Sequence, residues 1–203
     1  MTTFDKLTEL FREFPGIGPR QAKRFVYFLL SRDSSFLGEL SGLIEVLKQD
    51  IVQCADCFRL FAKRGSLTRC PICADSSRVH RELMVVAKDT DLEAMEKSGT
   101  FEGQYFVLGG TMTLIPRKCS DKLRLKELET RIARDVKSGV LKEVILALSA
   151  NPDGEYTSEE LRKLIGPLGV TVSTLGRGLS TGSELEYADT ETIKSALKNR
   201  SSG

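Results

Sequence analysis

The chain has 203 residues, of which 40% are hydrophobic and 29% charged, and its formal net charge is +2. This balance is typical of a globular protein and excludes a polycation or a low-complexity chain. No apolar run approaches the length that a bilayer requires, and no basic stretch followed by an apolar run marks a signal peptide. We therefore expect a cytoplasmic protein.

The first expected element is a helix over residues 5–14, DKLTELFREF, whose leucines and phenylalanines recur at helical spacing. Pro15 ends this helix, and the glycine turn GIG follows. Pro19 stands where a second helix begins, in the position that tolerates a missing N–H group. This is the helix-hairpin-helix pattern. A further helix over about residues 36–49 has apolar residues on one side, and we interpret it as a packing helix.

The hairpin turn is a candidate phosphate site. Gly16 and Gly18 leave backbone N–H groups exposed, and the N-terminus of the second helix adds about half a positive charge. Arg20, Lys23 and Arg24 follow directly and would flank a phosphate without reading any base. The alternative is an ordinary helical hairpin in which the glycines only turn the chain.

Four of the five cysteines form two CxxC pairs within residues 54–73, CADCFRLFAKRGSLTRCPIC. In a reducing compartment, such pairs indicate a metal site rather than disulfides. Four thiolates provide the closed tetrahedral coordination of a structural Zn²⁺ ion. A redox dithiol pair is the alternative, and neither His80 nor Cys119 is expected to be a ligand. The predicted ligands of one structural zinc ion per chain are Cys54, Cys57, Cys70 and Cys73.

Beyond the finger, short β-rich runs alternate with helical stretches. The expected strands are 83–88, 104–110, 143–149 and 170–175, and the expected helices between them are 90–99, 120–138 and 157–169. This alternation predicts a mostly parallel sheet covered by helices. Functional groups of such sheets collect at the carboxyl ends of the strands.

Asp153 and Glu155 follow the third of these strands. Acidic side chains at a strand end can hold Mg²⁺, so a metal-dependent nuclease or primase-like enzyme that uses these two residues is the alternative function. The first strand, however, ends in Ala87, which has no oxygen to offer. The two acidic residues can equally be turn residues ahead of a helix that Thr157 or Ser158 caps.

The remaining acidic and glycine-rich positions are interpreted as local structure. Asp89 and Asp91 are expected to start the helix after the first strand, and Asp189 to cap the final helix. Glycines around Arg177 imply sharp turns, which indicate either a docking or oligomer contact or a plain connector. We expect Asp153, Glu155 and Arg177 to serve partner or oligomer docking.

The parts follow one another in the order PGIGP hairpin, CxxC-x12-CxxC finger, α/β body and closing GRGL-x2-G-x-ELEYAD. This order closely resembles the RecR family of bacterial recombination mediators over essentially the whole chain. The resemblance implies an α+β chain of several parts with a Toprim domain. These parts are a helix-hairpin-helix domain (1–53), a four-cysteine zinc finger (54–82), a Toprim α/β domain with a mostly parallel sheet (83–176) and a C-terminal oligomerisation and docking segment (177–203).

The resemblance also implies a function. Family members are non-enzymatic DNA-binding adaptors, homodimers that join into a ring-like tetramer. They work with RecO and, in many bacteria, RecF, to help load RecA on gapped single-stranded DNA in recombinational repair at the nucleoid. Arg20 and Arg24 match the family's basic sites after the hairpin turn. An alternative function for this chain is that of a zinc-stabilised protein-interaction module that makes no contact with DNA.

Two departures from the family pattern stand out. Ala87 replaces the Glu that usually ends the Toprim strand, which disfavours catalysis and any partner contact through that carboxylate. The stretch 111–125 is shorter than the family's glycine-containing insertion, so docking through that loop is not expected with the same contacts. The chain also has no Trp and four Tyr residues, which argues against a dedicated single-strand stacking platform.

Overall fold

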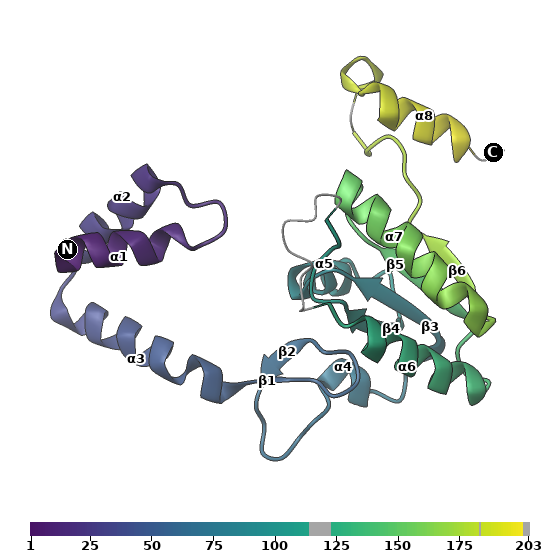
Figure 1. Cartoon of the computed structure of the whole chain (residues 1–203), viewed down its shortest axis with the longest axis horizontal. Coiled ribbons are helices and arrows are strands. Elements are labelled where there is room, and N and C mark those ends of the chain that lie inside the picture. The colour runs from purple at the N-terminus through teal and green to yellow at the C-terminus, as the bar shows by residue number, and fades with distance from the viewer. Residues whose placement is uncertain (114–122, 183, 201–203) are drawn as a thin grey trace. The chain divides into compact units, whose positions relative to one another are not determined.

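In a computed structural model of the chain, residues 1–113, 123–182 and 184–200 are described (Figure 1). The chain divides into two compact units, Met1–Val52 and Gln53–Gly203. Within the described ranges, no helix is both long and apolar enough to cross a membrane. Cys119 and most of the 111–125 stretch lie outside the described residues.

The N-terminal unit consists of three helices. Thr2 and Asp5 form a reciprocal capping box at the start of the first helix, and the second begins at Pro19, as predicted. Phe11 of the first helix contacts Phe25 of the second, with ring centroids 5.6 Å apart in an edge-on arrangement. The three helices are α1 (Thr3–Arg12), α2 (Pro19–Leu30) and α3 (Ser34–Asp50).

Much of the apolar surface of this unit is exposed. Only Ala22 and Val26 are buried in α2, and α3 buries no residue at all. Leu43 and Ile44 of α3 are 60% and 63% exposed. Phe36 of α3 contacts Phe28 of α2, with ring centroids 6.1 Å apart, so α3 packs in part as expected, whereas most of its apolar side is not buried within its own unit.

The second unit contains a four-stranded sheet in the order β4-β3-β5-β6, and each pair of neighbouring strands is parallel. Val85 of β3 stands between Phe106 of β4 and Leu146 of β5 in the ladder. The predicted parallel sheet is thus confirmed. Its strands are β3 (Val79–Val86), β4 (Gly103–Val107), β5 (Glu143–Ala147) and β6 (Thr171–Thr174). A separate two-stranded sheet pairs β1 (Ile51–Gln53) with β2 (Leu60–Ala62).

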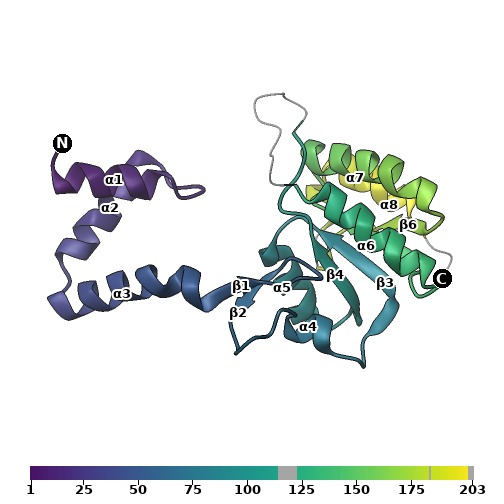
Figure 2. The same ribbon diagram turned by 60° about the horizontal axis from the view of Figure 1, so that its bottom comes forward.

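Among the described residues of this unit, five α-helices accompany the strands, and α6 and α7 lie side by side (Figure 2). Leu83 and Val85 of β3 join the main core with side chains of α6 and α7. Met84 and Val86 are buried too, and strand alternation directs them to the opposite face. The helices are α4 (Pro71–Ala74), α5 (Asp89–Ser98), α6 (Leu125–Lys137), α7 (Pro152–Ile165) and α8 (Thr190–Lys198); the short 3₁₀ turns are η1 (Gly166–Leu168) and η2 (Leu185–Tyr187).

The start of α7 differs from the sequence-based expectation. Asn151 caps the helix by accepting a hydrogen bond from the N–H group of Gly154, and Pro152 occupies its first turn. Thr157 and Ser158, the expected caps, are buried inside the helix. The helix therefore begins five residues earlier than the expected position 157. As a result, the acidic pair lies in the first turn of α7 and not in a loop ahead of it.

Candidate metal centre, hairpin and docking pocket

The four cysteines of the two CxxC pairs come together in one buried cluster. Their sulfur atoms all lie within 4.8 Å of one another, and the Sγ atoms of Cys57 and Cys70 are 3.6 Å apart. Metal–sulfur bonds of about 2.3 Å in a tetrahedron require sulfurs about 3.8 Å apart. The cluster therefore fits a tetrahedral metal ion with closed coordination.

Local structure explains how the knuckles form. The Phe58 N–H group donates to the Cys54 carbonyl oxygen at 3.1 Å, which closes the first turn, and Pro71 opens the short helix α4 that carries Cys73. The Cys70 N–H group donates to the Cys54 Sγ atom at 3.3 Å. An amide aimed at sulfur stabilises a thiolate, as metal ligation requires.

The thiols are electrostatically dependent on one another. A hydrogen bond from Cys57 lowers the pKa of Cys54, and the same interaction raises the pKa of Cys57. Four thiolates cannot share this buried space without a compensating cation. A divalent metal ion would supply that charge and would tie the two CxxC segments of the chain together.

Hydrogen bonds from backbone and side-chain groups fasten the cysteine cluster to the sheet domain. The Val107 N–H group donates to the Cys57 carbonyl oxygen at 2.8 Å, and the Arg131 guanidinium donates to the Asp56 carbonyl oxygen at 2.8 Å. Asp89 starts α5, as predicted. Its carboxylate also accepts a hydrogen bond from the N–H group of Leu60, in β2, at 2.7 Å. No pattern in the sequence indicates this second contact, because its partners are 29 positions apart.

Phe58, directly after the second cysteine, adopts a left-handed backbone conformation with φ of 62°. Such a conformation costs an aromatic residue about 1 kcal/mol or more. The ring packs on Phe106 of the core with centroids 5.2 Å apart, and the Arg124 guanidinium lies 5.5 Å from its centre. These contacts offset the backbone cost and anchor the knuckle to the main core.

In the N-terminal unit, the two glycines of the hairpin have different roles. Gly16 has φ of +76°, which favours glycine, whereas Gly18 has an extended conformation that any residue can adopt. Gly18 is the N-cap of α2 and provides no side chain to satisfy the first N–H groups of the helix. A Cβ atom at Gly18 would meet nothing within 4 Å. The helix N-terminus is therefore open to an external acceptor.

Three exposed cations follow this open helix end. Lys23 and Arg24 lie three and four residues after Arg20, and this spacing makes each of them a neighbour of Arg20 on the helix surface. Arg24 makes a 3.3 Å hydrogen bond to the side-chain oxygen of Gln21. Among the described residues, the three cations form no ion pair. This part of α2 has the donors and the charge that a phosphate requires.

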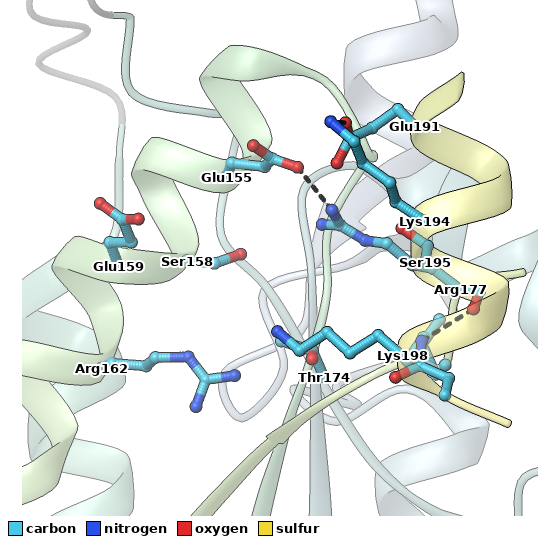
Figure 3. Close-up of a pocket in the computed structure, with 13 residues that line it drawn as sticks. Glu155, Ser158, Glu159, Arg162, Thr174, Arg177, Glu191, Lys194, Ser195 and Lys198 are labelled. Atoms are coloured by element: carbon cyan, nitrogen blue, oxygen red, sulfur yellow. Dashed lines mark hydrogen bonds and ion pairs between the residues drawn. The ribbon is translucent and has the colours of Figure 1, made fainter. Parts of the chain in front are cut away.

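The third group of predicted residues lies at the other end of the chain. The Arg177 guanidinium pairs with the Glu155 carboxylate of α7 at 2.5 Å, and the Asn199 side chain donates to the Arg177 carbonyl oxygen at 2.8 Å. Around them, α7, the end of β6 and α8 enclose a cavity of about 620 Å³, here called the α7–α8 pocket (Figure 3). Asp153 is not among the residues that line this pocket.

Gly154 is a structural requirement that the sequence did not reveal. A Cβ atom at this position would overlap the carbonyl oxygen of Ser149 and crowd the Asn151 side chain. Only glycine lets the first turn of α7 approach the preceding loop so closely. The position of Glu155, one residue later, depends on this contact.

Among the described residues, Asp153 and Glu155 belong to no carboxylate cluster that could hold a metal ion. Within the part of the chain that the structure describes, the four cysteines are the one group of three or more Cys, His, Asp or Glu residues able to hold a metal ion. Ala87 is buried directly after β3, and its carbonyl oxygen accepts a hydrogen bond from the N–H group of Gly109. The end of this strand thus offers no side-chain ligand.

The fold and the sites define a protein that combines a helix-hairpin-helix unit with a four-cysteine centre and a Toprim-type sheet. Three family models match: one described as a Toprim domain over residues 81–176, one as RecR, helix-hairpin-helix, over 4–47, and one as RecR, C-terminal, over 178–201. Together they cover most of the chain.

Full-length relatives agree with these matches. The chain is 39% identical to Recombination protein RecR of Acidothermus cellulolyticus, covering 93% of this chain and 90% of that protein. It is 36% identical to Recombination protein RecR of Dehalococcoides mccartyi (97% and 92% covered) and of Lactobacillus acidophilus (96% and 94% covered). The chain belongs to the RecR family. Its relatives are named as recombination proteins and not as enzymes, and this membership supports a role in recombinational DNA repair.

Proposed function

We propose that the protein is a non-enzymatic recombination mediator, a DNA-binding clamp and adaptor that assists the loading of RecA on gapped single-stranded DNA. The observation that carries this proposal is the uncapped N-terminus of α2 beside Arg20, Lys23 and Arg24. Amides and cations of this kind contact phosphates irrespective of base sequence, and such contacts weaken as salt rises. A protein that acts at gaps of any sequence needs this type of contact.

In this proposal, the metal is zinc and its role is structural. Four buried cysteines leave no open coordination position for a substrate or an activated water molecule. Asp153 and Glu155 are assigned to docking and not to catalysis, and the ion pair of Glu155 with Arg177 supports that assignment. Mg²⁺-dependent cleavage or synthesis that Asp153→Asn abolishes would instead support the enzymatic alternative.

The protein is further proposed to act as a homodimer that joins into a ring-like tetramer, with RecO and, where present, RecF as partners. The exposed leucine, isoleucine and phenylalanine side chains of the N-terminal unit support self-association, because a monomer rarely leaves so much apolar surface in water. Encirclement by a ring slows escape from DNA even when each phosphate contact is weak. The four-part division at residues 53, 82 and 176 and the association with the nucleoid belong to the same proposal.

The test is fluorescence anisotropy with gapped, single-stranded and duplex DNA at low and high salt, using the zinc-loaded full chain. The charge reversal Arg20→Glu with Arg24→Glu is expected to weaken binding at least about a hundredfold, since each charged contact contributes about 1.5–3 kcal/mol. The matched control, Lys6→Glu with Lys48→Glu, makes the same change in charge on α1 and α3. Equal loss in both variants, or none in either, would count against a hairpin phosphate site.

A further inference from the structure

Two cations of the α7–α8 pocket form no ion pair with any carboxylate of the described residues. Arg162 of α7 donates a hydrogen bond to the Val172 carbonyl oxygen at 3.2 Å. Lys198 of α8 also lines the pocket, and neither residue forms an ion pair with any other described residue. Figure 3 shows both side chains pointing into the same space, near Thr174.

The other two cations of the pocket are already paired. Arg177 is held by Glu155 at 2.5 Å, and Lys194 lies 3.6 Å from Glu191. These pairs leave Arg162 and Lys198 as the available positive charges. A ligand with a carboxylate or phosphate group would gain charge-assisted hydrogen bonds from both side chains.

We propose that Arg162 and Lys198 bind an acidic side chain of an extended peptide segment supplied by a partner protein. This inference rests on the docking role proposed for this end of the chain, and it names the chemistry of the partner. Nothing in the sequence analysis pointed to either residue, because they are 36 positions apart and come to line one pocket only in the folded chain.

A peptide fits the walls of the pocket better than a nucleic acid does. Glu155 and Glu191 already pair with lining cations and Glu159 adds a negative charge, so the pocket offers two available cations and not the continuous positive surface that a nucleic-acid backbone requires. The lining contains no aromatic side chain on which a base could stack. A peptide, in contrast, can place one carboxylate on the two cations and direct N–H groups towards the glutamates.

The edge of the sheet offers the backbone contacts that a peptide would use. In the described sheet, β6 is the last strand and pairs on one side only, with β5. Thr174 at the end of β6 lines the pocket together with Leu175 and Gly176. An open strand edge can accept an added strand, in which backbone hydrogen bonds give affinity and side-chain pockets give selectivity. The cation pair beside this edge would supply the selectivity for acidic residues.

The experiment uses a fluorescein-labelled hexapeptide of alternating Glu and Val, a pattern suited to an extended strand, with a Gln and Val peptide as the uncharged control. Anisotropy is measured on the zinc-loaded full chain. Saturable binding of the acidic peptide is expected, and Arg162→Glu with Lys198→Glu is expected to weaken it at least about tenfold. Both side chains are exposed, so the variant is expected to keep its fold, and far-UV circular dichroism checks this.

The matched control is Lys163→Glu with Arg200→Glu, which changes the charge equally on neighbouring residues that do not line the pocket. Binding should be unchanged in this control. The proposal is overturned if the wild type shows no saturable binding, if both double variants lose it equally, or if the Gln peptide binds as well.

A second arm separates this proposal from the function on which it rests. Gapped DNA should not displace the acidic peptide, and Arg162→Glu with Lys198→Glu should leave DNA binding intact. If the pocket variant instead loses DNA binding as the Arg20 and Arg24 reversal does, the pocket is a nucleic-acid site and the peptide proposal is wrong. Peptide binding that persists in the hairpin variant would show that the two sites act separately.

Discussion

The cysteine finger and the N-terminal helices both contain too little buried apolar surface to be stable by packing alone, and they differ in what compensates for this. The finger gathers four thiols and is fastened to the sheet domain by hydrogen bonds from Val107 and Arg131. The N-terminal unit has Ala22 and Val26 buried in α2 and no buried residue in α3. The first region has a site that a metal ion would complete, whereas the second leaves apolar side chains exposed.

Removal of the metal is expected to have the largest effect, and to affect only one of the two regions. Cys57→Ser, or a chelator, should unfold residues 54–73, because metal-coupled folding contributes on the order of 10 kcal/mol in small zinc sites. Hydrogen exchange read residue by residue should show full loss of protection there and little change in α1 and α2. Elemental analysis checks the metal content, and Cys119→Ser is the control that should retain one zinc ion per chain.

An unchanged finger after complete metal removal would show that the hydrogen bonds to the sheet domain are sufficient. The comparison between the two regions would then fail, since both would be held by ordinary packing and hydrogen bonding.

Gly154→Ala is the next largest expected effect and tests the sheet domain itself. The added Cβ atom would overlap the Ser149 carbonyl oxygen, so the first turn of α7 must move, at a cost of about 2–3 kcal/mol. Gly166→Ala is the matched control. Gly166 has a helical conformation and open space around its Cβ direction, so the change should stay within about 0.5 kcal/mol. The midpoint of thermal unfolding distinguishes the two variants, and equal midpoints would contradict the steric argument.

The features that the sequence predicted correctly are those that neighbouring residues determine. Pro19 at the start of α2 and Asp189 as the cap of α8 act on N–H groups within a few positions. The parallel sheet follows from alternating strand and helix patterns, and the cysteine spacing indicates a metal-binding cluster. Each of these signals depends on residues that are close together in the sequence, so it can be recognised without the structure.

The features that were missed depend on contacts between distant segments. The Asp89 carboxylate accepts a hydrogen bond from the N–H group of Leu60, and Arg162 and Lys198 line one pocket from two different helices. The start of α7 was placed at Thr157 because Thr and Ser are good caps, whereas Asn151 followed by Pro152 was the stronger signal. The exposure of α3 was missed for another reason: an amphipathic pattern predicts that a face is covered, but not by which molecule.

The smallest expected effect on stability comes from Leu43→Glu with Ile44→Glu. This variant tests whether the apolar side of α3 is exposed in the monomer. Both side chains are mostly exposed in the single chain, so the free energy of unfolding of the monomer should change by no more than about 0.5 kcal/mol. Truncation of a fully buried residue of the sheet domain, Leu161→Ala, should cost about 2–5 kcal/mol.

If a second copy covers α3, however, two buried charges would disrupt that contact, and sedimentation equilibrium should show a smaller assembly. A variant that keeps its assembly while its monomer loses stability would mean that α3 packs within its own chain. In that case the N-terminal unit would be stable without a second molecule. The two regions would then differ only in what stabilises them within one chain, which is apolar packing in the N-terminal unit and a metal ion in the finger.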